Sequence, residues 1–178
     1  MQKNLLIMSE MPQYFVDLAD KNFNTHKLWL QDDEDKFISE IQEKVDAIAV
    51  MGGYKITPEL MKSMTNLKII ACYGVGYDAI DIDYAKSLGI KVTNTPEVLN
   101  DEVADTAIAL MLCVYRKILE ADKFARTNSW INGEFPLTKK FSGSKLGSVG
   151  MGRIGKAIAK RAESFNCTIS YHSRNKKN

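Results

Sequence analysis

The sequence predicts an α/β protein with parallel sheets, and three observations lead to this fold class. Short apolar runs alternate with helix signals along the first half of the chain. The runs are almost continuously apolar, as expected of strands that are covered on both faces. After residue 144 a strand, a helix and a second strand follow in the same order. Such alternation is typical of parallel sheets with helices on both sides.

The first half is predicted to hold five strands, at residues 5–8, 26–30, 45–51, 67–72 and 90–93. Helices are expected between them. The acidic run 32–35 suits a helix start, where it meets the positive end of the helix dipole. Thr57 is expected to cap the next helix, with Pro58 in its first turn. Gly89 is expected to end the helix over residues 81–88.

The pattern changes after Pro96, where we place a domain boundary. A long helix is predicted over residues 100–127, capped by Asn100 or Asp101. From 103 to 115 it is apolar almost all round, so we expect it to be buried against two layers or a partner chain. A polar loop is expected up to residue 144. A strand at 145–149, a helix at 153–164 and a strand at 168–171 are then predicted.

Composition excludes some function classes. The 178 residues include 24 basic and 22 acidic side chains, and this balance gives no reason to expect nucleic acid or a membrane surface as a partner. Three widely spaced cysteines are expected to be buried thiols rather than a disulfide framework or a metal site. The longest apolar stretch, 107–115, is too short to cross a bilayer, and no secretory signal is visible. We expect a cytoplasmic protein.

The segment 150–155, GMGRIG, follows a predicted strand and opens a predicted helix. This context predicts a dinucleotide phosphate loop. Gly150 would permit the tight turn, Gly152 would let the backbone approach a pyrophosphate, and Gly155 would let the helix pack close to the strand. Free N–H groups at the helix start would bind the phosphates. A glycine-rich turn without a ligand is the alternative.

The end of the following strand lacks the Asp or Glu that normally holds the ribose 2′-hydroxyl of NAD. Ser173 and Arg174 stand there instead, and they could hydrogen-bond a 2′-phosphate. Lys176 and Lys177 add positive charge. We therefore expect NADP(H) as the preferred cofactor, with NAD(H) possible. A solvated basic tail is the alternative.

A second glycine turn follows the strand at 67–72. Gly74 and Gly76 would free backbone N–H groups to hold an anion, such as a substrate carboxylate. Both glycine turns come at the carboxyl ends of predicted strands, so we expect residues 74–77 and 150–155 to face one cleft. The residues alone equally allow an ordinary strand-to-helix turn at 74–77.

Three segments resemble motifs of the D-isomer-specific 2-hydroxyacid dehydrogenases. Residues 74–81 resemble the family's substrate loop, residues 89–96 followed by 100–111 resemble its next motif, and residues 149–155 resemble its cofactor loop. They occur in the family's order and spacing over about residues 45–175. Within the family, the Ser173-Arg174 pair makes the chain most similar to the glyoxylate and hydroxypyruvate reductases.

The resemblance implies a flavodoxin-like substrate domain over residues 1–97 and the start of a Rossmann NAD(P)-binding domain over 98–178. The helix 100–127 would lie in a homodimer interface. The resemblance also implies site residues: the Val75 and Gly76 amides on the substrate carboxylate, Val103 near the nicotinamide, Arg153 and Ile154 on the pyrophosphate, and Ser173 and Arg174 on the adenosine ribose or its phosphate.

The implied activity is NAD(P)-dependent interconversion of small D-2-hydroxy acids and 2-oxo acids, such as reduction of glyoxylate or hydroxypyruvate. The family's catalytic arginine, glutamate and histidine come later than residue 178. We therefore assign no catalytic residue, interpret the chain as truncated within the cofactor domain, and expect no turnover by it alone. A non-catalytic dinucleotide-binding or regulatory module, and a dehydrogenase for formate or phosphite, stay open.

One residue departs from the family within the cofactor strand. Ser148 stands where the family usually has a large aliphatic side chain. A buried hydroxyl there should cost stability unless it is hydrogen-bonded.

Overall fold

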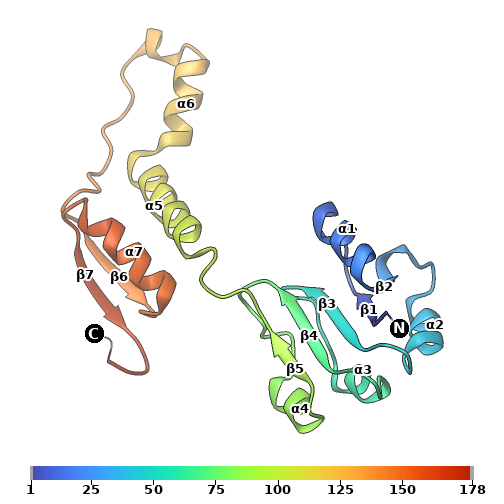
Figure 1. Cartoon of the computed structure of the whole chain (residues 1–178). Helices are drawn as coiled ribbons and strands as arrows, with labels where there is room; N and C mark the ends of the chain where they lie inside the picture. The colour runs from blue at the N-terminus through green and yellow to red at the C-terminus, as the bar shows by residue number, and fades with distance from the viewer. Residues whose placement is uncertain (1, 177–178) are drawn as a thin grey trace. The chain divides into compact units, whose positions relative to one another are not determined.

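The computed structural model describes residues 2–176. The chain forms two compact units, which meet in the sequence between Pro96 and Glu97. Figure 1 labels their helices and strands. Lys177, to which we attributed added charge, lies outside the described residues.

The first unit is built on a five-stranded sheet with the order β2-β1-β3-β4-β5, in which all neighbours are parallel. This is the strand order of flavodoxin-like folds, so the predicted fold class is confirmed. All carboxyl ends of the strands lie at one edge of the sheet. The strands are β1 (Asn4–Ile7), β2 (Asn24–Lys27), β3 (Ala47–Met51), β4 (Ile69–Tyr73) and β5 (Lys91–Thr93).

Four helices connect these strands: α1 (Gln13–Asn22), α2 (Glu34–Ile41), α3 (Pro58–Ser63) and α4 (Ile82–Ser87). Three of them begin at a side chain that accepts a hydrogen bond from the first helical turn, namely Asp33, Thr57 and Asp81. The predicted cap at Thr57 is confirmed. Gly89 follows α4 with a φ of +72°, a left-handed conformation that suits glycine at a helix end.

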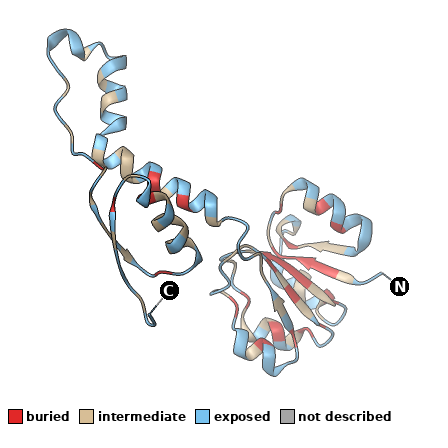
Figure 2. Ribbon diagram, turned by 60° about the vertical axis from the view of Figure 1, so that its left-hand side comes forward, coloured by how far each residue is buried: buried red, intermediate tan, exposed pale blue. Residues whose placement is uncertain are grey.

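The core of this unit lies on both faces of the sheet. Successive residues of β1 alternate between two apolar clusters: Leu6 joins the larger one, and Leu5 and Ile7 join the smaller one. Val16 and Ala19 of α1 also belong to the smaller cluster. The buried residues concentrate on the sheet and on the inner sides of its helices (Figure 2). Burial on both faces explains why the inner strands β1, β3 and β4 are mostly apolar, whereas the edge strands β2 and β5 carry polar residues.

The second predicted strand is partly wrong. β2 ends at Lys27, and residues Leu28–Leu30 form a short 3₁₀ helix closed by a hydrogen bond from the Gln31 N–H to the Leu28 carbonyl. Leu28 is buried in the larger cluster and Trp29 packs against the smaller one. A short apolar run does not distinguish such a turn from a strand.

The second unit contains a parallel strand–helix–strand arrangement. β6 (Lys145–Val149) pairs with β7 (Thr168–His172), and α7 (Arg153–Glu163) connects them. Ile108 of α5 (Asn100–Arg116) joins Phe141, Ala162 and Cys167 in the core of this unit. The opposite face of the two strands is uncovered within the described residues, and Val149 there is 95% exposed.

The prediction of one continuous helix over residues 100–127 is wrong, because the structure has two helices there. α5 ends at Arg116, Lys117 adopts a left-handed conformation with φ +49°, and α6 (Ile118–Arg126) continues in another direction (Figure 1). The cap position is Leu99, without a side-chain cap, rather than Asn100 or Asp101. A short 3₁₀ helix, Ser129–Asn132, interrupts the loop that follows α6.

The surface of α5 is also more open than we expected. Ala104 and Ile108 are its buried residues, whereas Leu110 is 61% exposed and Val114 is exposed as well.

Cys113 on this helix is half-buried, unlike the buried Cys72 and Cys167, so the expectation of buried thiols is confirmed for two of the three cysteines. None of the helices in residues 2–176 combines the length and apolarity needed to cross a membrane.

Candidate functional site

The turn between β6 and α7 is shaped by two glycines. Gly150 has a φ of +98°, a conformation that side-chain-bearing residues rarely adopt, and its N–H donates to the His172 carbonyl over 2.7 Å. A Cβ on Gly155 would lie 2.6 Å from the Gly150 carbonyl oxygen. The first turn of α7 therefore packs directly on the turn that precedes it.

The N-terminus of α7 is open. Gly152 occupies the cap position, and no side chain caps the helix. The backbone N–H groups of Gly152, Arg153 and Ile154 donate to no acceptor within residues 2–176. The first turn carries no acidic residue, and a Cβ on Gly152 would meet nothing within 4 Å. Unpaired N–H groups at the positive end of a helix dipole favour an anion.

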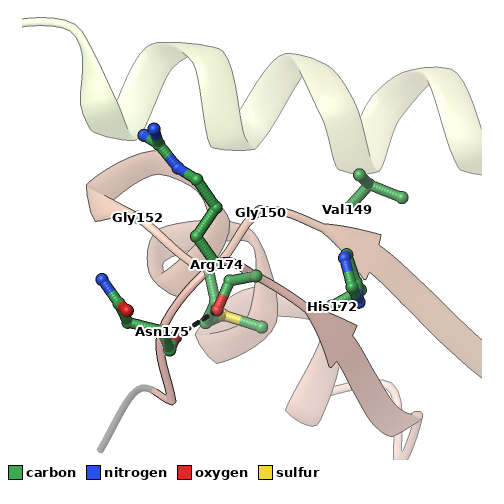
Figure 3. Close-up of a pocket in the computed structure, with 8 residues that line it drawn as sticks. Val149, Gly150, Gly152, His172, Arg174 and Asn175 are labelled. Atoms are coloured by element: carbon green, nitrogen blue, oxygen red, sulfur yellow. Dashed lines mark hydrogen bonds between the residues drawn. The ribbon is translucent and has the colours of Figure 1, made fainter.

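A pocket of about 630 Å³ lies beside this turn. It brings the glycine turn together with the end of β7, where the ribose-binding residues were expected (Figure 3). The Ser173 hydroxyl donates to the Asn175 carbonyl. The lining residues are Val149, Gly150, Met151, Gly152, His172, Ser173, Arg174 and Asn175.

Other predicted cofactor residues do not line this pocket. Arg153 forms an ion pair with Glu97, with 2.6 Å between Nε and Oε1, and both side chains are mostly exposed. Ile154 is half-buried in α7. Val103 lines a separate apolar hollow of about 420 Å³ on α5, together with Leu99, Ala107 and Leu110. The roles expected of Arg153, Ile154 and Val103 stay predictions.

His172 was not among the residues predicted for the site, yet its side chain lines the pocket. The register of the two strands explains its position, because His172 pairs with Val149, the last residue before the glycine turn. If the two predicted strands are aligned in parallel, the residue opposite Val149 lies beside the glycine turn, and this alignment could have predicted the position of His172. Asn175 was missed for lack of any pattern around it.

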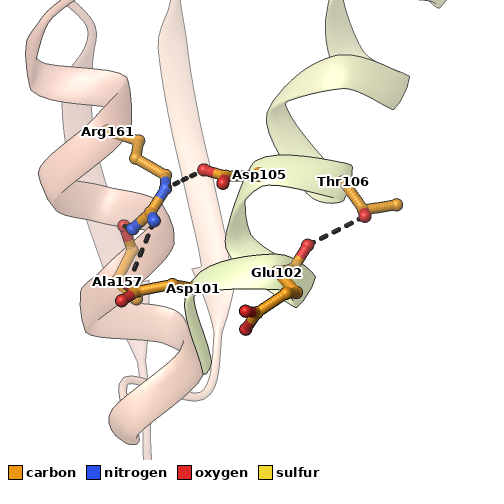
Figure 4. Close-up of polar contacts among 6 residues, drawn as sticks. All are labelled: Asp101, Glu102, Asp105, Thr106, Ala157 and Arg161. Atoms are coloured by element: carbon orange, nitrogen blue, oxygen red, sulfur yellow. Dashed lines mark hydrogen bonds and ion pairs between the residues drawn. The ribbon is translucent and has the colours of Figure 1, made fainter. Parts of the chain in front are cut away.

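Arg161 holds α7 against α5 (Figure 4). Its guanidinium contacts two carboxylates on successive turns of α5: Nη2 lies 3.0 Å from Asp101 Oδ1, and Nε donates to Asp105. Nη1 donates to the Ala157 carbonyl over 3.2 Å. Asp105 and Asp101 raise the pKa of Arg161 further above its usual value. These contacts link α7, which has the glycine turn at its N-terminus, to α5.

Ser148 donates its hydroxyl to the Gly150 carbonyl over 2.7 Å. The hydroxyl is thus hydrogen-bonded, which removes the stability cost expected of an unpaired polar group. It also ties the strand to the glycine turn.

The first unit carries the second glycine turn, residues 74–76, at the carboxyl end of β4. Each of its three carbonyls accepts a hydrogen bond: Gly74 from the Thr95 N–H at 2.9 Å, Val75 from Asn94 Nδ2 at 2.9 Å, and Gly76 from Cys72 Sγ at 3.4 Å. Burial raises the pKa of the Cys72 thiol, so the thiol stays protonated and can donate. The Val75 and Gly76 amides donate to no acceptor within residues 2–176. That both glycine turns face one cleft stays a prediction.

Residues 5–173 match the family described as "D-isomer specific 2-hydroxyacid dehydrogenase, catalytic domain". The chain belongs to this family. The sequence-based recognition is confirmed by a match over nearly the whole chain.

Relatives of this 2-hydroxyacid dehydrogenase chain include a hydroxyphenylpyruvate reductase of Plectranthus scutellarioides, 42% identical over 97% of this chain and 55% of the relative. A solved 2-hydroxyacid dehydrogenase from Ketogulonicigenium vulgare is 36% identical with a TM-score of 0.92, over 99% of this chain and 56% of its own. A NADPH-dependent glyoxylate/hydroxypyruvate reductase from Sinorhizobium meliloti, solved with NADP and malonate, is 36% identical with a TM-score of 0.84, over 99% of this chain and 55% of its own. The chain spans about half the length of these proteins.

Replacing Gly155 of this dehydrogenase-family chain by alanine is expected to destabilise the second unit by about 1–3 kcal/mol, because overpacking forces the backbone to shift. The added Cβ would collide with the Gly150 carbonyl at 2.6 Å. Thermal unfolding measures the loss. Gly147→Ala is the matched control, since a Cβ on Gly147 in β6 would meet nothing within 4 Å. Equal melting temperatures for the two variants would show that the close approach at Gly155 is not required.

Proposed function

We propose that this chain supplies a substrate-binding domain, predicted over residues 1–97, and the first part of a dinucleotide-binding domain, predicted over residues 98–178, of an NAD(P)H-dependent reductase of small 2-oxo acids. Glyoxylate and hydroxypyruvate are the proposed substrates. The pocket beside the open N-terminus of α7 carries this proposal, because it joins an anion-favouring backbone to a basic side chain, Arg174.

The residues around the pocket fit a dinucleotide. Gly150 and Gly152 leave the backbone open to a pyrophosphate, and the amides of Gly152 to Ile154 are unpaired within the described residues. Arg174 and the Ser173 hydroxyl suit a 2′-phosphate, for which a charged donor is the stronger partner. We therefore propose NADP(H) as the preferred cofactor and NAD(H) as a weaker one.

The proposed division of labour follows from these contacts. When bound, the nicotinamide dinucleotide supplies the hydride that reduces the carbonyl at C2 of the oxo acid. The Val75 and Gly76 amides would hold the substrate carboxylate, since two adjacent unpaired N–H groups can both donate to one carboxylate. The pocket residues would hold the cofactor. No residue of the chain is assigned the proton transfer.

The relatives support this substrate class. The names of the similar proteins specify reduction of hydroxyphenylpyruvate, glyoxylate and hydroxypyruvate. All three substrates are 2-oxo acids, so the part they share is the carboxylate beside a carbonyl. A cytoplasmic location stays a prediction from the sequence.

A titration of the chain with NADPH, followed by the nucleotide's fluorescence, tests the proposed function. We expect saturable binding, weaker for NADH than for NADPH. The absence of saturable binding for both nucleotides would contradict the proposal. Binding that survives unchanged in an Arg153→Glu variant would contradict the placement of the pyrophosphate at the start of α7, because the new carboxylate would repel it.

We also propose that the chain self-associates through α5. Leu110 is 61% exposed there and borders the apolar hollow at Val103. Leu110→Lys is expected to weaken association about tenfold, because a charge buried in an apolar contact is costly. Sedimentation velocity across a concentration series measures this. Leu18→Lys is the control, since Leu18 on α1 is 62% exposed. If both variants changed association equally, α5 would not be the contact.

A further inference from the structure

The segment that follows β5 donates hydrogen bonds to backbone carbonyls of the glycine turn at residues 74–76. The backbone N–H of Thr95 donates to the Gly74 carbonyl, and the side-chain amide of Asn94 donates to the Val75 carbonyl, each over 2.9 Å. Two consecutive residues thus tie two consecutive peptide units of the turn.

These two hydrogen bonds determine where the amides of the turn point. A trans peptide unit is planar, with its C=O and N–H on opposite sides, and the described chain has no cis peptide bond. The Gly74 carbonyl shares its peptide unit with the Val75 N–H, and the Val75 carbonyl shares its unit with the Gly76 N–H. Holding both carbonyls toward the end of β5 therefore turns both N–H groups away from it.

We propose that Asn94 is a positioning residue for carboxylate binding: by holding the Val75 carbonyl, its side-chain amide aims the Gly76 N–H at the substrate carboxylate. This inference rests on the proposed function of Val75 and Gly76. Thr95 orients the Val75 N–H in the same way, but it acts through its backbone, which a side-chain substitution leaves in place. The contribution of Asn94 can therefore be removed by itself.

The chemistry of the position favours asparagine. Asn94 is half-buried, so its side chain is held in place, and it offers an N–H donor without a charge that would compete for the substrate. Aspartate has nearly the same shape but cannot donate when ionised, and its charge would repel the Val75 carbonyl oxygen. Without the donor, the peptide unit between Val75 and Gly76 is free to rotate away from the carboxylate.

The test is a titration of the ¹⁵N-labelled chain with oxalate, followed by NMR. In the unaltered chain we expect the Val75 and Gly76 amide signals to shift together and saturate. Asn94→Ala and Asn94→Asp are expected to raise the dissociation constant about tenfold, because a hydrogen bond to a charged group loses its alignment. The shift of the Gly76 signal is expected to shrink more than that of Val75, which a general loss of stability would not produce.

Asn66→Ala is the matched control. The Asn66 side-chain amide donates to the Glu43 carbonyl over 2.5 Å, so the same substitution removes the same kind of bond within the same unit. Asn66 precedes β4, whereas the glycine turn follows it, so the bond lies at the other end of the strand. We expect oxalate binding to be unchanged in this variant. The aspartate variant carries the test if Asn94→Ala does not fold.

The outcomes separate this inference from the proposed function. Oxalate binding that is intact in the unaltered chain and equally tight in both Asn94 variants would overturn the positioning role alone. An equal loss in Asn66→Ala would overturn it too, since the loss would then follow stability. If Val75 and Gly76 did not respond to oxalate in the unaltered chain, the proposed carboxylate site and the inference would both be wrong.

Discussion

The 178-residue chain, mixed with NADPH and either glyoxylate or hydroxypyruvate, is expected to show no steady-state oxidation of NADPH. Reduction of a carbonyl by hydride requires a proton donor near the developing alkoxide, and a cation usually fixes the acid. Neither of the two histidines is placed to act as this donor, so we expect turnover below detection.

The two histidines of the chain do not supply this donor. His26 lies in β2, with its Nε2 3.2 Å from Asn4 Oδ1. Burial of the ring is the main cause that lowers the pKa of His26, and the positive charge of Lys44 lowers it further. Most of it is therefore neutral at neutral pH. His172 lines the pocket among the proposed phosphate and ribose residues, so it would face the dinucleotide.

The exposed apolar surface of the chain is a second reason to expect no turnover. One face of β6 and β7 is uncovered within residues 2–176, and α5 exposes Leu110 and Val114. A surface of this kind favours association and leaves a bound nucleotide open to water. We expect the purified chain to be oligomeric or poorly soluble. Clear turnover that is lost in an Arg153→Glu variant would contradict the prediction, whereas turnover that this variant leaves unchanged comes from a contaminating host enzyme.

Arg174→Ala is expected to weaken NADPH binding about tenfold or more and to leave NADH binding nearly unchanged. Arg174 and Ser173 line the pocket at the end of β7, and the position holds no acid that would favour the 2′-hydroxyl of NAD. A charge-assisted hydrogen bond contributes on the order of 1.5–3 kcal/mol. Titration of both nucleotides into both proteins measures the difference.

Lys176→Ala is the control for this prediction. It removes the same charge from an exposed neighbour that does not line the pocket. If Lys176→Ala weakened NADPH binding as much as Arg174→Ala, the loss would result from the lower positive charge of the segment and not from a specific contact of Arg174. An equal loss of NADH and NADPH in Arg174→Ala would contradict the assignment of this residue to the 2′-phosphate.

The fold was largely predictable because its signals are local. Buried parallel strands appear as apolar runs, and capping residues such as Thr57 indicate where a helix begins. The break at Lys117 was not predictable, because a lysine in a left-handed conformation has no sequence signature comparable to glycine or proline. Asn100 and Asp101 suit a helix cap, but Arg161 engages Asp101 from another helix, and a partner 60 residues away is invisible in the local pattern.

The candidate site was predictable only in part, for the same reason. Gly150 is required by its positive φ and Gly155 by a close approach, and both demands leave a spaced glycine pattern. His172 enters the pocket through strand register, and Asn94 reaches the Val75 carbonyl from a different strand end. Such contacts depend on the three-dimensional arrangement and on ordinary polar residues, so no motif marks them.

A crystal structure of the chain grown with NADPH shows directly whether the start of α7 binds the cofactor's pyrophosphate. We expect the pyrophosphate within hydrogen-bonding distance of the Gly152, Arg153 and Ile154 amides, with the 2′-phosphate against Ser173 and Arg174. We also expect the ion pair of Arg153 with Glu97, 2.6 Å long in the free chain, to be broken or shared. A nucleotide bound elsewhere, with the N-terminus of α7 free, would contradict the proposed cofactor site.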